Sequence, residues 1–274
     1  MNSEQKTQWA LVTGASAGIG EEFCNQLAAL NWSIVLVARR EDRLNSIADR
    51  LTQEYGIQCR CYSLDLASPD AIEKLMASLE ADGIQPGFLV NNAGYGVPGK
   101  FTEPDWQTHA ASLRVMLSTV CELTWRLLPG MQQIGRGYIV NVASLAGLVS
   151  GSAGHTLYGA TKSFLIKFSE SLAMENRDTG ISVSALCPGF TYSEFHDVLG
   201  SRDLMDQMAS YMWMDADEVV RFGIDSVMKK PALIVAVPGR VNRFIATLFR
   251  LLPRKTALAM IQRQSKAYRA LDEH

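Results

Sequence analysis

Residues 9–20 read WALVTGASAGIG, and this stretch decides the fold class of the 274-residue chain. Its apolar start, Trp9 to Val12, predicts a buried strand, and the residues after the glycines, Glu21 to Leu30, have the spacing of a helix. A strand, a glycine-rich turn and a helix in this order point backbone N–H groups and the positive end of a helix dipole at an anion. The stretch therefore predicts a turn that binds the pyrophosphate of a dinucleotide.

The glycines of this turn have an uncommon spacing. They follow the pattern Gly-x3-Gly-x-Gly, whereas the commoner dinucleotide fingerprint is Gly-x-Gly-x2-Gly. Because they stand directly at a strand-to-helix junction, they fit a close approach to pyrophosphate better than a flexible loop. The three residues are Gly14, Gly18 and Gly20.

A rival interpretation treats part of the same stretch as the nucleophile turn of a serine hydrolase. Residues 14–18 match the pattern Gly-x-Ser-x-Gly, with Ser16 as the nucleophile. That fold places the turn after several strands, whereas only 15 residues precede Ser16. It also needs an acid and then a histidine further along the chain, and none of the four histidines has an evident partner in the sequence. A hydrolase that uses Ser16 is therefore a remote alternative.

Length and composition indicate one α/β domain that extends from residue 1 to residue 274. Hydrophobic residues make up 47% of the chain, and a strand followed by a helix recurs about every 25 to 30 residues. Central strands read as continuous apolar runs, such as Phe88 to Val90 and Tyr138 to Val142, as expected where both faces are covered. We therefore expect a doubly wound, Rossmann-like parallel sheet of about seven strands with helices on both faces.

Charge and cysteine content argue against several other classes of protein. A net charge of −2 disfavours a nucleic-acid partner, whose binding usually depends on a basic patch. The first eight residues are polar, so we expect no signal peptide, and no apolar run approaches the 18 or so residues that a membrane span needs. The five cysteines include no Cys-x2-Cys pair, so we expect reduced thiols, no metal site and a cytoplasmic location.

Tyr158 and Lys162 are four residues apart in a segment whose apolar spacing predicts a helix. Residues at i and i+4 share a helical face, so a phenol and an ammonium can act on one reacting atom. Lowering the pKa of a tyrosine from near 10 to about 7 requires roughly 4 kcal/mol, which a cation about 4 Å away supplies at an effective dielectric of about 20. Tyr158 could then exchange a proton near neutral pH while Ser144, 14 residues upstream, holds the same substrate oxygen.

The end of the second predicted strand indicates which dinucleotide binds. An NAD-binding protein carries a carboxylate about 20 residues after the glycine turn, where it contacts the ribose 2′-hydroxyl. This chain has Ala38, Arg39 and Arg40 after the apolar run Ser33 to Val37. A guanidinium binds phosphate with a planar fork, so Arg39 is our candidate for the 2′-phosphate of NADP. Arg40 either assists it or begins the next helix.

Together these residues resemble the short-chain dehydrogenase/reductase family in its single-domain, NADP-preferring form. Thr13-Gly14-x3-Gly18-Ile19-Gly20 is similar to the family's cofactor turn, and Asn91-Asn92-Ala93-Gly94 to its motif at the centre of the sheet. The matches keep the family order from residue 8 to about 195. They end with the catalytic residues and the nicotinamide-side loop, namely Ser144, Tyr158, Lys162, Pro188, Gly189 and Ser193.

The resemblance implies an oxidoreductase, a carbonyl reductase or alcohol dehydrogenase, with NADP(H) as its cofactor. NADPH would deliver a hydride to a carbonyl carbon while Tyr158 gives its oxygen a proton, or the reverse for an alcohol. Ser144 would orient the carbonyl, and Lys162 would also bind the nicotinamide ribose. The implied cofactor-binding residues are Gly14, Ser16, Gly18, Ile19, Gly20, Arg39, Arg40, Asp65, Leu66, Asn92, Ala93, Gly94, Tyr158, Lys162, Pro188, Gly189, Thr191 and Ser193.

One residue departs from the family pattern at a place that bears on mechanism. Met116 stands where the family usually has an asparagine that helps to hold a proton-relay water. A thioether is at best a weak hydrogen-bond acceptor. Either the backbone carbonyl of residue 116 suffices, or proton return is slower, or the chain is a non-catalytic or weakly active NADP-binding relative.

Two segments of the last third bear on the substrate and on partners. Residues 191–214 are rich in Met, Tyr and Phe, and in the family this segment forms a substrate lid, so we expect a bulky hydrophobic ketone or alcohol. Residues 240–274 form a predicted C-terminal helical extension that begins as a basic amphipathic segment. Such a segment can lie on a membrane surface, on the body of the protein or on another subunit, and membrane contact is the less favoured of these.

The resemblance also implies self-association. Family members usually assemble through two long helices, here roughly residues 105–128 and 157–178. We therefore expect a homodimer or homotetramer that acts on a small molecule.

Overall fold

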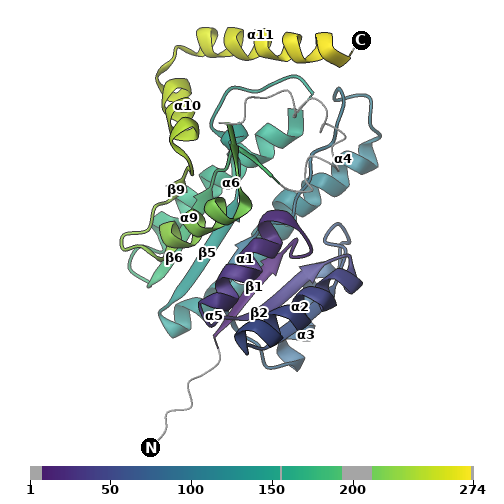
Figure 1. The fold of residues 1–274 in the computed structure, drawn as a ribbon, viewed down its shortest axis with the longest axis vertical. Coiled ribbons are helices and arrows are strands. Elements are labelled where there is room, and N and C mark those ends of the chain that lie inside the picture. The colour runs from purple at the N-terminus through teal and green to yellow at the C-terminus, as the bar shows by residue number, and fades with distance from the viewer. Residues whose placement is uncertain (1–7, 155, 193–211, 273–274) are drawn as a thin grey trace, which may run out of the picture.

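The computed structural model describes residues 8–154, 156–192 and 212–272, with side chains up to residue 263 in the last helix. Its main sheet has seven parallel strands in the order β3-β2-β1-β4-β5-β6-β9 (Figure 1). The strand order runs outward in both directions from β1 and β4, so the crossover connections leave in opposite senses from this pair. The predicted doubly wound parallel sheet is confirmed.

The strands of the main sheet correspond to the predicted apolar runs. Their bounds are β1 (Trp9–Thr13), β2 (Ser33–Ala38), β3 (Cys59–Ser63), β4 (Pro86–Asn91), β5 (Gly137–Val142), β6 (Ile181–Leu186) and β9 (Val235–Ala236). The last strand is short, because only two of its residues pair with β6. A second, two-stranded sheet consists of β7 (Phe190–Thr191) and β8 (Trp213–Met214).

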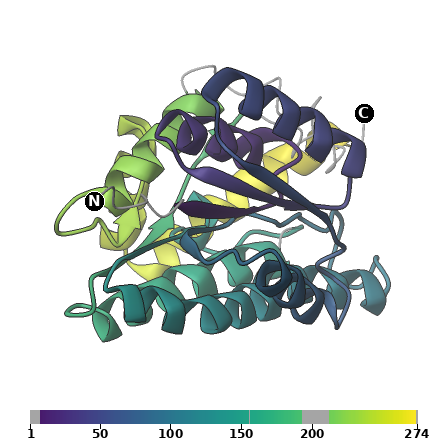
Figure 2. The same cartoon turned by 90° about the horizontal axis from the view of Figure 1, so that it is seen from below.

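Helices cover both faces of the sheet, as Figure 2 shows. On one face pack α1 (Gly18–Ala29), α2 (Glu41–Tyr55) and α9 (Ala216–Met228). On the other face pack α3 (Ala71–Ala81), α5 (Thr119–Ile134) and α6 (Thr156–Glu175).

The burial pattern explains this arrangement. Every residue of β1 and β2 is buried, and alternate side chains point to opposite faces. Val12 belongs to the cluster under α1 and α2, whereas its neighbour Leu11 belongs to the cluster under α3 and α5. Full burial of a side chain such as leucine contributes about 1.5–3 kcal/mol, so a strand with both faces buried is strongly held in register.

A chain of polar side chains crosses the core and joins the sheet to two helices. The amide Nδ2 of Asn91 donates to Asn141 Oδ1 at 2.8 Å and to Thr124 Oγ1 at 3.1 Å. Asn141 Nδ2 in turn donates to Ser169 Oγ at 2.8 Å. These four residues are buried, so their hydrogen bonds align β4 and β5 with α5 and α6.

The long helix expected over residues 105–128 has three parts and extends further than expected. It consists of α4 (Trp106–Leu113), one π-helical turn (Arg114–Ser118) and α5, which continues to Ile134 with Pro129 inside it. Asp105 caps the start, since its carboxylate accepts a hydrogen bond from Thr108 N at 2.7 Å. Met116 lies within the π-helical turn, a feature that is frequent at functional sites.

Two helices follow the last strand at the carboxyl end of the sheet. They are α10 (Arg240–Leu251) and α11 (Arg254–Asp272), which is yellow in Figure 1. No helix of the described part of the chain is long and apolar enough to cross a membrane.

Asn242 attaches the start of α10 to the body of the protein. Its buried amide donates to Pro238 O at 3.0 Å and to Met214 Sδ at 3.5 Å. The same amide lies so close to Gly189 that a Cβ at position 189 would overlap it. The loop after β6, the small sheet and α10 are therefore packed as one unit around this side chain.

We expect Gly189→Ala to lower the free energy of unfolding by about 1–3 kcal/mol, because the added Cβ would overlap the amide of Asn242. Asn242→Ala removes that amide, so the double variant should have nearly the same free energy of unfolding as Asn242→Ala alone. Urea unfolding of the three variants measures this coupling.

The matched control for this experiment is Gly159→Ala, which adds a helical Cβ 3.6 Å from Ala146 O and should not destabilise the fold. An equal loss of stability from Gly189→Ala in both backgrounds would contradict the contact.

Candidate active site

The glycine turn between β1 and α1 is fixed by close backbone contacts. Gly14 has a φ of 67°, and a Cβ there would lie 2.7 Å from Asn92 Nδ2. A Cβ at Gly20 would overlap the carbonyl oxygen of Gly14, so the first turn of α1 lies directly against the loop. Only glycine allows this conformation and this approach. The turn therefore exposes backbone rather than side chains, as binding of a pyrophosphate requires.

Hydrogen bonds tie this turn to the end of β4. Thr13 Oγ1 accepts from the backbone N–H groups of Asn92 and Ala93, both at 3.0 Å, and donates to Val90 O at 3.2 Å. Asn92 Nδ2 donates to Thr13 O at 2.9 Å. The motif at residues 91–94 thus holds the cofactor turn in place, and the sequence had not assigned Thr13 this function.

The start of α1 suits an anionic group. The residue before the helix is Ala17, which has no side chain able to cap it, and Gly18 opens the helix with a φ of 55°. Uncapped N–H groups at a helix start form an anion-binding site. Ile19 packs against the core behind this turn. These residues therefore fit a dinucleotide pyrophosphate.

The two arginines after β2 occupy different positions. The guanidinium of Arg40 donates to Ser16 Oγ from Nη2 at 3.0 Å and from Nε at 3.2 Å, and to Ser16 O from Nη2 at 3.2 Å. Arg40 therefore lies across the glycine turn. Arg39, the first choice from the sequence, lies near Tyr95 and lowers the pKa of that phenol, against the larger effect of burial, which raises it.

The contact between Arg40 and Ser16 also bears on the hydrolase alternative. A nucleophilic serine needs a neighbouring base, and the partner of Ser16 is a guanidinium, which cannot accept a proton. The hydroxyl of Ser16 thus accepts hydrogen bonds from Arg40 and has no base beside it, among the described residues, that would make it a nucleophile.

Asp65 and Leu66 follow β3 at the same edge of the sheet. The exposed carboxylate of Asp65 accepts from Ala67 N at 3.0 Å. Leu66 is buried, and its carbonyl accepts from Thr119 Oγ1 at 3.0 Å. The carboxylate of Asp65 therefore remains at the surface, while the backbone of Leu66 is held against α5.

Ser144, Tyr158 and Lys162 lie together at the carboxyl ends of β5 and β6. A side-chain hydrogen bond joins Tyr158 and Ser144, and Ser144 Oγ also accepts from Ala146 N at 3.1 Å. Lys162 Nζ lies 5.5 Å from the centroid of the Tyr158 ring and donates to Val142 O at 2.7 Å. The structure therefore brings together the three groups that the sequence selected.

Burial dominates the electrostatics of this cluster. It raises the pKa of Tyr158 to about 12, against a smaller lowering by the hydrogen bond with Ser144. It lowers the pKa of Lys162 to about 8, against a smaller raising effect of Cys187. The expected lowering of the phenol pKa by Lys162 is therefore absent from this arrangement. Burial of the phenol raises its pKa, and the lysine nitrogen is bonded to Val142 O instead.

Met116 and Lys162 both lie close to Gly94. A Cβ at Gly94 would lie 3.4 Å from Met116 Sδ and 3.8 Å from Lys162 Nζ. Thr161 Oγ1 is 3.8 Å from the same sulfur. Met116 is buried, and it fills the space beside the lysine with a thioether instead of a strong polar group.

The loop after β6 completes the site. Pro188 O accepts from Leu145 N at 2.8 Å, which links this loop to the one that carries Ser144. Thr191 is buried, and its hydroxyl donates to Gly189 O at 3.2 Å. Ser193 lies outside the described residues.

Sequence reasoning missed two residues that touch the site, Cys187 and Asn242. Burial raises the pKa of the Cys187 thiol to about 12, and Lys162 lowers it to a smaller extent, which places the thiol near the ammonium. The position of Cys187 directly before Pro188-Gly189 was a usable signal, whereas nothing local indicated that Asn242 packs on Gly189.

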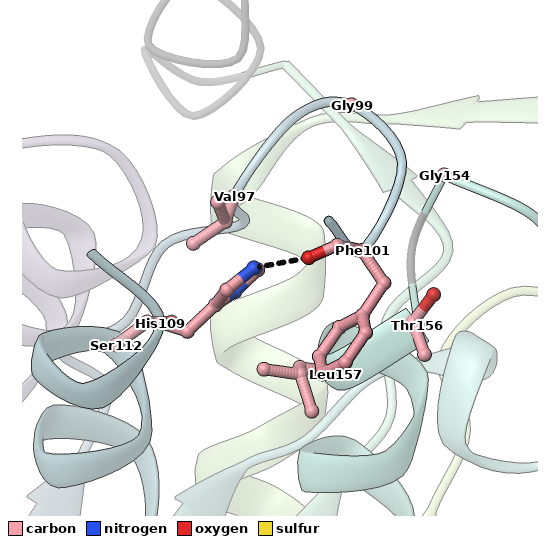
Figure 3. Close-up of a pocket in the computed structure, with 8 residues that line it drawn as sticks. All are labelled: Val97, Gly99, Phe101, His109, Ser112, Gly154, Thr156 and Leu157. Carbon is pink, nitrogen blue, oxygen red and sulfur yellow. Dashed lines mark hydrogen bonds between the residues drawn. The ribbon is translucent and has the colours of Figure 1, made fainter. Parts of the chain in front are cut away.

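A small cavity adjoins the residue before Tyr158 (Figure 3). His109 Nε2 donates to Phe101 O at 2.9 Å, and His109 Nδ1 is buried without a partner in the described part of the chain. The cavity volume of about 10 Å³ holds about one water molecule. Its lining residues are Val97, Gly99, Phe101, His109, Ser112, Gly154, Thr156 and Leu157.

In residues 8–154, 156–192 and 212–272, no group of three or more His, Cys, Asp or Glu side chains is arranged to hold a metal ion.

Curated proteins of related sequence are oxidoreductases. The chain is 29% identical over 267 residues to a very-long-chain 3-oxoacyl-CoA reductase from Anas platyrhynchos, covering 96% of this chain and 81% of that protein. It is 32% identical over 192 residues to a 7beta-hydroxysteroid dehydrogenase from Collinsella aerofaciens, covering 70% of this chain and 72% of that protein.

Solved structures share the whole fold. A 7beta-hydroxysteroid dehydrogenase structure superposes with a TM-score of 0.82 at 26% identity, covering 95% of this chain and 99% of that one. A short-chain dehydrogenase from Sphingobium yanoikuyae in complex with NADPH superposes with a TM-score of 0.78 at 28% identity, covering 90% of this chain and 96% of that one. The bulky-bulky ketone specific alcohol dehydrogenase from Comamonas testosteroni superposes with a TM-score of 0.74 at 26% identity, covering 91% of this chain and 96% of that one.

The family model for short chain dehydrogenase matches residues 8–203, which include the glycine turn, the motif at 91–94 and the three clustered side chains. This chain therefore belongs to the short-chain dehydrogenase/reductase family of oxidoreductases.

Proposed function

We propose that this protein interconverts a bulky hydrophobic ketone and the corresponding secondary alcohol, with NADP(H) as its cofactor and Tyr158 as the acid and base. The observation that carries the proposal is the cluster of Ser144, Tyr158 and Lys162 at the carboxyl ends of the strands, with Lys162 close to Gly94 of the motif that holds the glycine turn. Ligands of doubly wound sheets bind at this edge.

NADPH, when bound, supplies the hydride for the carbonyl carbon. Tyr158 then gives its phenolic proton to the carbonyl oxygen, and its raised pKa of about 12 means that it holds that proton at neutral pH. The hydroxyl of Ser144 accepts from Ala146 N and is hydrogen-bonded to Tyr158, so both hydroxyls would donate to the same carbonyl oxygen once a substrate lies between them.

Lys162 would hold the nicotinamide ribose and stabilise the phenolate that proton transfer leaves behind. Its pKa of about 8 lies close to neutral pH, so a hydrogen-bonding or anionic neighbour readily shifts it toward the charged form. The buried setting strengthens the attraction between that ammonium and a phenolate.

Preference for NADP(H) over NAD(H) rests on the basic end of β2. A planar guanidinium binds a ribose 2′-phosphate in a bidentate manner, and Arg40 already lies on the glycine turn through Ser16. Arg39 comes directly after the same strand, and its side chain is exposed. The NADPH complex of the Sphingobium relative supports this choice.

A bulky hydrophobic substrate is supported by aromatic side chains at the described ends of the segment 191–214 and directly before it. The rings of Tyr192 and Trp213 stack with centroids 4.7 Å apart, and Phe190 packs on Trp213 at 5.6 Å. Most of the predicted lid, residues 193–211, lies outside the described residues. Relatives named for steroid, bulky ketone and very-long-chain 3-oxoacyl-CoA substrates favour the same class.

Self-association through α5 and α6 is part of the proposal. Large apolar side chains remain exposed on these helices, namely Trp125 on α5, and Phe164 and Met174 on α6. A second copy of the chain would cover them, which favours a homodimer or homotetramer. A cytoplasmic location also belongs to the proposal, since all five cysteines are free thiols.

A non-catalytic NADP-binding role is the second candidate, and Met116 is the observation that favours it. The thioether stands beside Lys162 where a polar group would connect the lysine to solvent. Cofactor binding without turnover on any carbonyl would then be expected.

We expect Tyr158→Phe to reduce turnover of a hydrophobic ketone by at least about a hundredfold, because the variant has no proton to donate. NADPH binding should change little, since the ring is kept. Steady-state rates and NADPH fluorescence titration measure the two quantities. Tyr62→Phe is the control, because that phenol bonds to Asp82 at the far edge of the sheet. Unchanged turnover in Tyr158→Phe would overturn the assignment.

We expect Arg40→Asp to weaken NADPH binding by about tenfold or more and NADH binding by a smaller factor, because only NADPH has the 2′-phosphate whereas both cofactors bind the glycine turn that Arg40 crosses. Arg39→Asp is the matched variant with the same change of charge, and we expect a smaller loss. Fluorescence titration with both cofactors measures the four affinities. An Arg40→Asp variant that binds NADPH as tightly as the parent would remove Arg40 from the phosphate site.

We expect Met116→Asn to raise the turnover number severalfold, because an amide can hold the relay water that a thioether binds poorly. Met116→Leu keeps the size and removes the sulfur, and it should have the parent's rate. Turnover numbers at saturating cofactor measure the difference. No turnover in the parent or in Met116→Asn with any of a panel of ketones would favour the non-catalytic role.

A further inference from the structure

Positive charge is concentrated at the C-terminal end of this chain. Residues 240–274 contain eight Lys and Arg and only two Asp and Glu, whereas residues 1–239 contain 18 Lys and Arg and 26 Asp and Glu. The net charge of −2 hides this separation. An asymmetry of this kind indicates a negatively charged partner for the basic part.

The structure exposes this charge on one side of α10. Arg240, Arg243 and Arg250 are exposed and lie on the same side of the helix, because their spacing is three and seven residues. Asn242 faces the opposite way and is buried against the loop after β6. The arginines therefore point outward from the attached face.

Large apolar side chains stand beside these arginines. Phe244 is 67% exposed and Leu251 is 77% exposed, and their spacing of seven residues places both on one edge of α10. We name the exposed side of α10 the C-terminal face, and its residues are Arg240, Arg243, Phe244, Thr247, Arg250 and Leu251.

The following helix continues the same surface properties. Arg254 and Lys255 at the start of α11 are exposed, as are Leu258 and Met260. Ala257 is the one buried residue within 254–263, the part of α11 whose side chains are described. Two successive helices thus combine exposed cations with exposed apolar side chains.

These helices lie at the end of the molecule where the active site opens. The loop that leads to α10 leaves the carboxyl end of β9, which is parallel to β6, and α11 crosses this end of the molecule (Figure 1). The buried contacts of Asn242 attach α10 to Gly189 and Met214 at the same edge.

We propose that the C-terminal face, together with the start of α11, docks on an anionic lipid surface. Arginines attract the headgroups of acidic lipids, and Phe244 and Leu251 can enter the boundary between headgroups and acyl chains. A nucleic acid or an acidic polypeptide would satisfy the arginines and leave the two exposed apolar side chains in water. Lipid is therefore the partner that accounts for both kinds of exposed residue.

Docking in this orientation places the carboxyl edge of the sheet next to the bilayer. A hydrophobic substrate could then pass from lipid to the site without crossing water. This consequence rests on the proposed function, whereas docking itself does not.

The test is cosedimentation of the full-length protein with vesicles of phosphatidylcholine alone or mixed with phosphatidylserine. The protein should bind only the mixed vesicles, and binding should fall as salt is added. Arg243→Glu combined with Arg250→Glu should weaken binding by about thirtyfold or more, because each basic residue near such a surface contributes about fivefold and each glutamate adds repulsion. Phe244→Ser combined with Leu251→Ser should weaken it as well.

Lys229→Glu combined with Lys230→Glu is the matched control. Both lysines are exposed after α9, which runs back to the opposite end of the sheet, and the change of charge is the same. This variant should bind like the parent. Turnover of a water-soluble ketone in the arginine variant reports on the proposed function separately from docking.

Four results would overturn docking on lipid. They are equal binding to neutral and mixed vesicles, no binding to either, equal losses in the arginine and lysine variants, and binding to single-stranded RNA or polyglutamate at the same salt with no binding to vesicles.

Discussion

The hydroxyl of Thr13 makes the hydrogen bonds on which the rest of the site depends. It accepts from the N–H groups of Asn92 and Ala93 and donates to Val90 O, which joins the ends of β1 and β4. These neighbouring strands stand where the strand order reverses, so their connections diverge and leave room for a ligand. The glycine turn above them keeps its shape because it is fixed to this junction.

Burial controls the chemistry beside that junction. It favours the neutral form of both titratable groups, since it raises the pKa of Tyr158 and lowers that of Lys162. A phenol that retains its proton suits carbonyl reduction, and an amine with a pKa of about 8 responds to small changes around it. Met116 adds to the apolar surroundings of the lysine, which connects one departure from the family pattern to the electrostatics of the whole cluster.

Local patterns in the sequence predicted the fold well, because the strands are apolar on both faces and the glycines mark the first strand-to-helix turn. The Tyr158–Lys162 spacing predicted a shared helical face, but not the direction of the phenol pKa, which depends on burial by distant segments. The sequence did not show that Arg40 bonds to Ser16, because this contact joins residues 24 positions apart. The contact of Asn242 with Gly189 joins positions 53 residues apart, and no local pattern encodes it.

The central claim is that the clustered side chains face the nicotinamide ring of a dinucleotide held by the glycine turn. A crystal structure of the protein with bound NADPH tests it most directly. The account predicts the pyrophosphate at the start of α1, the 2′-phosphate against Arg40, and the nicotinamide beside the hydroxyl of Tyr158. A dinucleotide bound elsewhere, or with its nicotinamide turned away from Tyr158, would contradict it.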